Sequence, residues 1–330
     1  MRVCGGWFIS QKHSQERRGE ERRADAGMVN LIRAYEPILR VIMRLAGMRP
    51  QKVEIKPGTV VNVWSPTRPS GKPAVVLLHG FSADGILTWQ FQALSLAGKY
   101  SVYVVDFIFF GGSATDDPDR SVAFQARCVA RALGMLGVDQ CTLVGVSYGG
   151  MVGFELARVE PELVRSLVVT CSVMTMTESI STDRLGKVAR SAGVAFTRWS
   201  DYLLPETSKG VRTLFQIGTY KLYRRIPDWV FRQYLEAMFD YRNEKTELLE
   251  ALVIPDDEDP NKIPNFLQPV RLLWGGNDKI FPLEMAQALK EKLGDTATLE
   301  HIDGAGHLVM LERPFAYNHR LRRILDSIHP

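Results

Sequence analysis

Cysteine is scarce in this sequence, and its few copies are scattered. The 330 residues contain four, Cys4, Cys128, Cys141 and Cys171, and no two of them have the C-x-x-C spacing. That pattern fits neither a disulfide framework nor a zinc site, so no metal is expected. We therefore expect a protein of a reducing compartment, the cytoplasm.

A large surplus of charge of one sign is also missing. Lys plus Arg number 41 and Asp plus Glu 37, which gives a formal net charge of +4. Nucleic-acid-binding proteins usually carry a strong basic stripe, so a nucleic-acid partner is not expected. Gly (27) and Pro (17) follow no fixed period, which excludes a collagen-like chain and argues against wholesale disorder.

Long apolar runs are absent from the first part of the chain. Residues 1–27 are rich in charge and lack the apolar core of a signal peptide, so secretion is not indicated. We expect a disordered tail here, or a start site placed upstream of a functional one at Met28.

Residues 28–49 are expected to form an amphipathic helix. Apolar residues between 30 and 48 recur at three- and four-residue steps, and Arg33, Arg40 and Arg44 fall on the other side. An interruption is expected at Pro37, and the three arginines argue against a membrane-spanning helix. Two interpretations stay open: a helix packed on its own domain, which we favour, or a basic helix in peripheral contact with a lipid surface.

From residue 53 onward, strand-like and helix-like patterns alternate. This alternation predicts an α/β fold with a mostly parallel sheet and helices on its faces, opened by an antiparallel hairpin around Pro57-Gly58. The expected strands are 53–55, 60–64, 74–78, 102–105, 143–146, 167–169, 270–274 and 299–302. Helices are expected at 121–136 and 151–158.

The alternation stops after Thr170 and resumes near Val270. Residues 174–266 contain long helix-like stretches such as 228–252 and many of the aromatic residues. We interpret this block as a helical cap inserted into one sheet, so that residues 50–173 and 267–330 together form the core.

A serine stands at the centre of the strongest local motif. Gly145-Val146-Ser147-Tyr148-Gly149-Gly150 follows a predicted buried strand and begins a predicted helix. A sharp strand-to-helix turn of this kind exposes a serine hydroxyl above the sheet. Gly145 and Gly149 are expected because side chains there would collide across the turn. Ser147 is the predicted nucleophile.

A serine hydroxyl needs a base, and the sequence offers six histidines. His13 and His329 lie near the chain ends, His319 in an apparent surface helix and His301 inside a strand pattern. His307 lies in a glycine-rich loop directly after the last predicted strand, where an imidazole can reach the edge of the sheet from which Ser147 emerges. His307 is the predicted base.

The imidazole in turn needs a carboxylate that fixes its tautomer. Asp278 follows a predicted strand, and the chain order Ser147, Asp278, His307 is the one expected for this type of triad. Asp106 is the rival acid, but it precedes the nucleophile. We assign Asp106 to hydrogen bonds that close the turn 106–113.

The negative charge of a tetrahedral intermediate calls for two backbone N–H donors. Tyr148, directly after the nucleophile, should supply the first, and Phe81, in the loop His79-Gly80-Phe81-Ser82, the second. Gly80 should allow close approach of the backbone, and His79 is assigned a supporting role in the loop.

Taken together, these segments resemble the α/β-hydrolase superfamily. The matching pieces are HGF (79–81), DFIFFGGS (106–113), GVSYGG (145–150), WGGNDKIFP (274–282) and GAGH (304–307). Within the superfamily, the sequence looks most like plant serine hydrolases related to monoacylglycerol lipases and to bacterial meta-cleavage-product hydrolases. The resemblance implies an eight-stranded sheet with a helical cap, hydrolysis of esters or related bonds without a cofactor, and a chain that starts near Met28.

Departures from relatives narrow this expectation. Ser147 stands where epoxide hydrolases and haloalkane dehalogenases of this fold have an aspartate. The HGGG loop of some esterases is absent, carbon–carbon hydrolases usually differ after the HG dipeptide, and the strigolactone- and karrikin-receptor branch differs around the serine.

The expected function is a serine carboxylester hydrolase that acts on an apolar small-molecule ester. The aromatic residues Phe196, Trp199, Phe215, Trp229 and Phe239 of the cap are expected to cover an apolar pocket. The alternatives are a carbon–carbon bond hydrolase and a ligand receptor on the same scaffold. The sequence does not indicate an oligomeric state.

Overall fold

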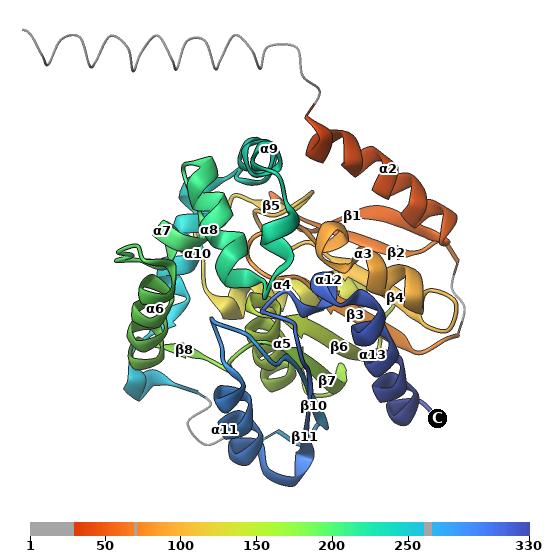
Figure 1. Cartoon of the computed structure of the whole chain (residues 1–330). Coiled ribbons are helices and arrows are strands. Elements are labelled where there is room, and N and C mark those ends of the chain that lie inside the picture. The colour runs from red at the N-terminus through yellow and green to blue at the C-terminus, as the bar shows by residue number, and fades with distance from the viewer. Residues whose placement is uncertain (1–29, 69–70, 261–265) are drawn as a thin grey trace, which may run out of the picture.

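A continuous β-sheet forms the centre of the protein (Figure 1). The computed structural model describes residues 30–68, 71–260 and 266–330, so the predictions for residues 1–27, His13, Cys4 and Met28 lie outside the described residues. The path β1-β2-β4-β3-β6-β7-β10-β11 contains the eight expected strands, and the short β5 pairs with β2 as an unexpected ninth. Their bounds are β1 Met48–Lys56, β2 Thr59–Pro66, β3 Ala74–Leu78, β4 Ser101–Val105, β5 Ala114–Thr115, β6 Cys141–Val146, β7 Val164–Thr170, β10 Val270–Gly275 and β11 Ala297–Ile302.

The pairing confirms a mostly parallel sheet. Strands β1, β2 and β5 pair antiparallel, and β2 pairs antiparallel with β4. From β4 across β3, β6, β7 and β10 to β11, every pairing is parallel. The central strands are buried on both faces, as continuous apolar runs predict, and no residue of the segment 75–78 is exposed.

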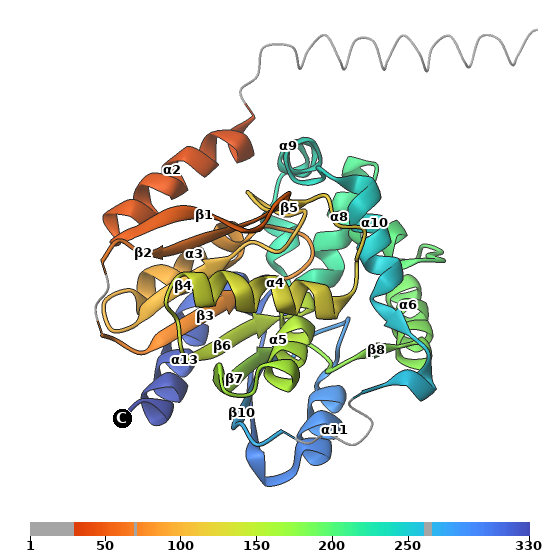
Figure 2. The ribbon, with the colours of Figure 1, turned by 180° about the vertical axis from the view of Figure 1, so that it is seen from behind.

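Helices cover both faces of the sheet (Figures 1 and 2). On one face α3 (Gly85–Leu96) contacts α12 (Val309–Glu312) and α13 (Pro314–Ile328). On the other, α4 (Val122–Met135) packs against α5 (Tyr148–Val159), while α11 (Leu283–Leu293) contacts β10 and β11. A 3₁₀ turn, η3 (Gly294–Thr296), leads into β11.

The first described helix, α2 (Leu31–Leu45), is continuous, so the interruption expected at Pro37 is wrong. Pro37 removes one backbone hydrogen bond but lies on the exposed side, where water can satisfy the freed carbonyl. The Asn30 side chain caps the helix by accepting from the N–H groups of Ile32 and Arg33. The helix also ends before Met48, which belongs to β1 rather than to the helical segment.

The chain between β7 and β10 is mainly helical. A small parallel pair, β8 (Met176–Thr177) with β9 (Val253–Ile254), brackets the helices. Between these strands lie α6 (Glu178–Ala192), α7 (Trp199–Leu203), α8 (Ser208–Gly218), η1 (Leu222–Arg225), α9 (Asp228–Met238) and α10 (Arg242–Ala251), and η2 (Asp256–Glu258) follows β9. We call residues 176–254 the helical insertion.

The expected continuous helical stretch 228–252 is broken in two, between α9 and α10. Helix α9 ends at Met238, and Tyr241, directly before α10, adopts a left-handed conformation, φ 54° and ψ 40°, which separates the two helices. Beyond the break, the Arg242 guanidinium donates hydrogen bonds to the carbonyl oxygens of Leu204 and Pro205. The stretch 228–252 contains no glycine or proline that would indicate the turn.

Within the described ranges, no helix combines the length and the apolar character needed to cross a bilayer.

Candidate active site

The carboxyl ends of the parallel strands bring the predicted site residues to one edge of the sheet. Ser147 directly follows β6, Asp278 lies three residues beyond β10, and His307 lies five residues beyond β11. Ligand sites of open α/β sheets are commonly found at this edge.

Ser147 occupies a sharp turn between β6 and α5. Its backbone has φ 53° and ψ −120°, an unusual conformation for a residue with a side chain. A Cβ on Gly145 would come within 2.4 Å of the Gly149 carbonyl oxygen, so this position excludes a side chain as expected. A Cβ on Gly149 would lie 2.2 Å from the Leu78 carbonyl oxygen. The clash at Gly149 is therefore with the end of β3 and not across the turn.

His307 is joined to Asp278. Its Nδ1–H donates to Asp278 Oδ2 at 2.8 Å, and both side chains are buried. The other carboxylate oxygen, Oδ1, accepts the N–H groups of Ile280 at 2.8 Å and Phe281 at 3.1 Å. These bonds fix the carboxylate, and the Nδ1 bond leaves Nε2 of the imidazole free to act as a base.

The loops that carry Asp278 and His307 are bonded to each other through their backbones. Asn277 N–H donates to the Ala305 carbonyl at 2.8 Å, and Gly276 N–H donates to the Ile302 carbonyl at 2.9 Å. A Cβ on Gly275 would lie 2.0 Å from the Gly306 carbonyl oxygen. The approach is too close for any side chain, so the position of His307 depends on glycine at 275.

Asp106 has the turn-closing role predicted for it. Its carboxylate accepts from Asn62 Nδ2 at 2.8 Å, Gly85 N–H at 2.9 Å and Gly112 N–H at 3.1 Å, and its own carbonyl accepts the Ser113 hydroxyl. Burial raises the pKa of this carboxyl above its ordinary value.

The other described histidines lie away from Ser147. His301 pairs with Asp303 at the surface, and His329 hydrogen-bonds to the Thr142 hydroxyl. His319 is exposed on α13. None of the three lines the pocket that contains Ser147.

His79 supports the loop after β3. The side chain is fully buried and makes two hydrogen bonds. Its Nδ1–H donates to the Gly80 carbonyl at 2.6 Å, and its Nε2 accepts the Phe107 N–H at 3.0 Å. Burial lowers the pKa of His79 to about 4, so the ring is neutral at physiological pH. A neutral ring that donates from Nδ1 and accepts at Nε2 fits both bonds.

The two predicted oxyanion donors flank Ser147. The rings of Phe81 and Tyr148 pack edge to face with centroids 5.7 Å apart. Tyr148 is the first residue of α5, so its N–H has no acceptor within the helix, and no acceptor for Phe81 N–H lies among the described residues. A Cβ on Gly80 would lie 3.7 Å from Ser147 Cβ, an ordinary contact. Gly80 is thus not required by the backbone; it leaves the space beside Ser147 open.

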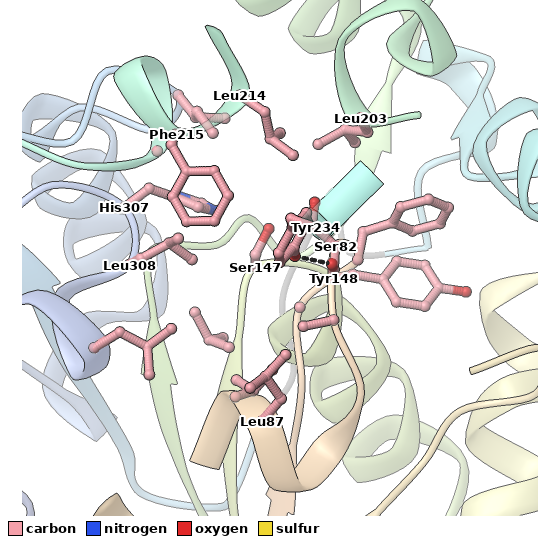
Figure 3. A pocket seen from close by; sticks show the side chains of 18 of the residues that line it. Ser82, Leu87, Ser147, Tyr148, Leu203, Leu214, Phe215, Tyr234, His307 and Leu308 are labelled. Atoms are coloured by element: carbon pink, nitrogen blue, oxygen red, sulfur yellow. Dashed lines mark hydrogen bonds between the residues drawn. The ribbon is translucent and has the colours of Figure 1, made fainter. Parts of the chain in front are cut away.

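Ser147 and His307 line one apolar cavity of about 410 Å³, shown in Figure 3. Of the aromatic residues expected to cover it, Trp199 and Phe215 line the cavity. The expectation is wrong for the other three, which do not line the cavity: the Phe196 ring packs against Tyr202, the Phe239 ring packs edge to face against Tyr234, and Trp229 is 40% exposed. Between the Ser147 hydroxyl and the His307 ring, both described, no hydrogen bond is present. This contact is often long in unliganded sites and tightens when substrate binds.

Sequence reasoning missed two residues beside the proposed triad. Cys171, in a left-handed conformation directly after β7, places its sulfur near Asp278 and His307, where it accepts Gly275 N–H at 3.3 Å. The next residue, Ser172, donates its hydroxyl to the Ser147 carbonyl at 2.6 Å. The position after a buried parallel strand was the signal that could have indicated both.

Sequence reasoning also missed Glu312, which connects the His307 loop to the helical insertion. Its Oε2 accepts the N–H groups of Gly306 at 2.9 Å and Tyr220 at 2.8 Å, and its Oε1 accepts those of Lys221 and Leu222. One carboxylate thus holds the residue before His307 and three residues of the insertion. No local pattern distinguishes Glu312 from a surface glutamate.

Cys171, Asp278 and His307 are also the one set of described residues whose spacing could suit a metal ion. Burial raises the pKa of the Cys171 thiol well above its ordinary value, so the sulfur is a neutral thiol and a poor metal ligand. Asp278 and His307 already bond to each other, so this set does not fit a metal.

Comparison with known proteins identifies the family. A family model described as "alpha/beta hydrolase fold" matches residues 73–314. The chain belongs to the α/β-hydrolase family. The resemblance to the α/β-hydrolase superfamily and the expected fold class are therefore confirmed.

Individual relatives of this α/β hydrolase are distant. Human monoacylglycerol lipase ABHD6 is 24% identical over 274 residues, which cover 79% of this chain and 78% of that protein. A putative lipase from Acinetobacter baumannii AYE superposes with a TM-score of 0.76 at 20% identity, over 89% of this chain and 96% of that one. The 2-hydroxy-6-oxo-6-phenylhexa-2,4-dienoate hydrolase of Rhodococcus sp. strain RHA1 has a TM-score of 0.68 at 21% identity, over 84% of this chain and 98% of that one. At such identities, the likeness to the solved structures concerns the fold.

Proposed function

We propose that this α/β hydrolase is a serine carboxylester hydrolase that acts on apolar acyl esters. The observation that carries the proposal is one apolar cavity lined by both Ser147 and His307, with His307 bonded to a buried Asp278 at 2.8 Å. The name of the human relative, a monoacylglycerol lipase, points to the same class of substrate.

In the proposed reaction, Ser147 Oγ attacks the acyl carbonyl while His307 Nε2 takes the hydroxyl proton. Asp278 holds the imidazole and stabilises the imidazolium that forms. His307 then delivers the proton to the leaving alcohol, which leaves an acyl group on Ser147. A water molecule, activated by His307, hydrolyses this ester and restores the hydroxyl.

The negative charge of each tetrahedral intermediate would be met by the N–H groups of Phe81 and Tyr148. Both donors belong to rigid parts of the chain, since the Phe81 ring is held against Phe110 and Tyr148. Donors fixed before the reaction need no reorganisation as charge develops, which is the main advantage of an oxyanion hole.

The lining of the cavity supports an apolar substrate. Arg225 is the one Lys, Arg, Asp or Glu residue among the described residues that line it. Apolar side chains of the insertion form part of the lining and suit an acyl chain. These side chains are Met176, Trp199, Leu203, Leu249 and Leu252.

An active-site-directed fluorophosphonate tests the nucleophile. We expect it to label the wild type and not Ser147→Ala, and equal labelling of both proteins would contradict the proposal. Ester hydrolysis by Ser147→Ala should fall by about six orders of magnitude, since removal of a serine nucleophile alone has that effect in related chemistry.

A substrate series tests the class of ester. With p-nitrophenyl esters of increasing chain length and with monoacylglycerols, we expect kcat/KM to rise with acyl length until the apolar cavity is filled. Stoichiometric labelling without turnover of any ester would instead favour the receptor, and cleavage restricted to vinylogous diketones would favour the carbon–carbon hydrolase.

A further inference from the structure

Helix α2 carries more apolar surface than its packing covers. Leu39 and Met43 are buried against the protein, and the helix contacts α3, α9 and β1. Five further large apolar side chains remain exposed: Leu31 (52%), Tyr35 (36%), Ile38 (55%), Val41 (51%) and Leu45 (83%). Packing on its own domain therefore accounts for only part of the apolar face seen in the sequence.

The exposed apolar residues form a strip along the helix. Leu31, Ile38 and Leu45 follow one another at seven-residue steps and so lie nearly in line. We call these three residues, with Val41 beside them, the α2 strip. The arginines of α2 lie in a row on the other, polar side of the helix, so the helix has the form of an interfacial amphipathic helix.

The α2 strip leads to the mouth of the cavity. Ile32 and Tyr35, on the same helix, line the cavity itself. On the neighbouring α3, Leu87 lines the cavity, and one and two turns further on Phe91 (41%) and Leu94 (39%) are exposed. Exposed apolar side chains thus extend from the lining outward on two contacting helices.

Other helices around the mouth add to this surface. On α9, Val230 lines the cavity and its neighbour Trp229 is exposed, while Leu311 lines it close to Phe315, which is 90% exposed at the start of α13. Nine of the thirteen exposed large apolar residues of the described chain lie on α2, α3, α9 and α13. Their concentration on these helices, of which α2, α3 and α9 also line the cavity, is not the scatter expected of an ordinary surface.

The charge beside this apolar surface is positive. Helix α2 has three arginines and one acid, Glu36, which pairs with Arg40. Arg33 donates to the Glu236 carbonyl and so keeps its net charge, and Arg44 has no acidic partner within the described residues. Arg225 adds a further cation at the cavity.

We propose that this face docks on an anionic lipid bilayer, with the α2 strip in the interface and the mouth of the cavity facing the leaflet. A helix with exposed apolar side chains on one side and arginines on the other suits the boundary between acyl chains and anionic headgroups. A protein seated on the same face would cover the mouth, whereas a bilayer can pass an apolar ester directly into it. The passage of an ester from the bilayer into the cavity rests on the proposed function, whereas the binding of the protein to the bilayer does not.

Sedimentation with vesicles tests the docking. The wild type should bind vesicles of phosphatidylcholine plus phosphatidylglycerol more strongly than vesicles of phosphatidylcholine alone. The triple variant Leu31→Gln/Ile38→Gln/Leu45→Gln should bind the anionic vesicles at least about tenfold more weakly. Arg44→Gln should weaken that binding about fivefold and leave binding to phosphatidylcholine unchanged. Glutamine preserves the helix, and none of these residues lines the cavity.

The matched control replaces exposed apolar residues elsewhere. Met135→Gln/Leu267→Gln changes side chains that are 58% and 87% exposed, outside the helices of the mouth. This control should bind the vesicles like the wild type. Equal loss of binding in control and triple variant would contradict a specific face, and retention of binding by the triple variant would overturn the proposal.

Two more measurements distinguish a loss of lipid docking from damage to the catalytic site and from the loss of a dimer. On a water-soluble short-chain ester, the triple variant should match the wild type, and on the same ester type embedded in vesicles it should be slower. Because binding is measured without turnover, failure of the serine-hydrolase assignment would leave the vesicle result standing. A wild-type dimer that the triple variant dissociates would show that a second copy covers the face and would overturn the lipid assignment.

Discussion

Two regions meet at the site: the edge of the sheet formed by the carboxyl ends of its parallel strands, called the edge below, and the helical insertion. They are built in different ways. At the edge, backbone groups touch one another and hold Ser147, Asp278 and His307 through hydrogen bonds and glycine contacts that admit no side chain. The insertion is held by side-chain packing, including a small separate cluster of Val211, Phe231 and Tyr234. Contact between backbones fixes geometry to fractions of an ångström, whereas apolar packing tolerates substitution of similar volume. The edge therefore suits the reaction, and the insertion suits the shape of the substrate.

Apart from the loss of Ser147, exchange of Asp278 for Asn should have the largest effect on activity. Asp278→Asn keeps the side-chain volume but places the wrong tautomer of His307 toward Ser147, so turnover should fall by about four orders of magnitude. The matched control is Asp106→Asn, at the other buried carboxylate of this edge. It should lower the free energy of unfolding by about 1–3 kcal/mol and leave kcat nearly unchanged. If Asp106→Asn abolished turnover instead, the assignment of the acid would be wrong.

Two glycines of the edge should respond differently to a methyl group. Gly275→Ala forces a Cβ to 2.0 Å from the Gly306 carbonyl oxygen, so we expect unfolding to become easier by at least about 3 kcal/mol. Gly80→Ala makes only ordinary contacts, 3.7 Å from Ser147 Cβ, and should leave stability within about 0.5 kcal/mol while lowering kcat/KM. Urea unfolding and ester kinetics measure both effects. Equal free energies of unfolding for Gly275→Ala and Gly80→Ala would contradict the inference that only position 275 excludes a side chain.

The buried His79 should make the stability of the edge depend on pH. Because its pKa is about 4 in the folded protein and near 6.5 unfolded, the unfolded chain binds more protons between these values. The stabilisation is complete above pH 6.5 and is lost as pH falls toward 4. The stability difference between wild type and His79→Gln should therefore shrink by about 2 kcal/mol from pH 7.5 to pH 5. A constant difference in urea unfolding would show that His79 does not titrate as inferred.

Glu312 connects the two regions, and its substitution should have the smallest effect. In Glu312→Gln an amide NH₂ group replaces one of the two oxygens, so two of the four N–H groups lose their acceptor. We expect kcat/KM to fall about tenfold, because the residue before His307 is no longer held to the insertion. Glu300→Gln, which alters a surface pairing of β11 with Arg320 and Arg323, is the matched control. Equal kinetics of the two variants would contradict a positioning role.

Much of the fold was predictable because its signals are local. Each of the eight expected strands appears, since an apolar run bounded by turn residues identifies a strand buried on both faces. The helices at 121–136 and 151–158 also appear, and α5 begins three residues before its predicted start because Gly149 and Gly150 weaken the local helical signal. Two predictions failed because of single residues. Helix α2 continues through the exposed Pro37, and the left-handed Tyr241 interrupts the helix expected over 228–252.

The residues of the site were predictable to a different degree. Ser147, Asp278 and His307 each follow a strand and could be found from that position and their glycine-rich surroundings. Cys171 also follows a strand but lacks glycine-rich surroundings, and Glu312 carries no local signal; only the fold shows that Cys171 lies beside the proposed triad and that Glu312 holds its loop. Which aromatic residues line the cavity could not be read from the chain, because helical periodicity does not say which side of a helix faces the sheet.

The sequence by itself determined the order of strands and helices, the turn at Ser147 and the candidate base and acid, because each depends on a few neighbouring residues. The tertiary structure alone decided which distant loops meet, which glycines are indispensable and which apolar side chains of α2 remain uncovered. Those properties depend on contacts between segments far apart in the chain, and such contacts exist only once the sheet has assembled.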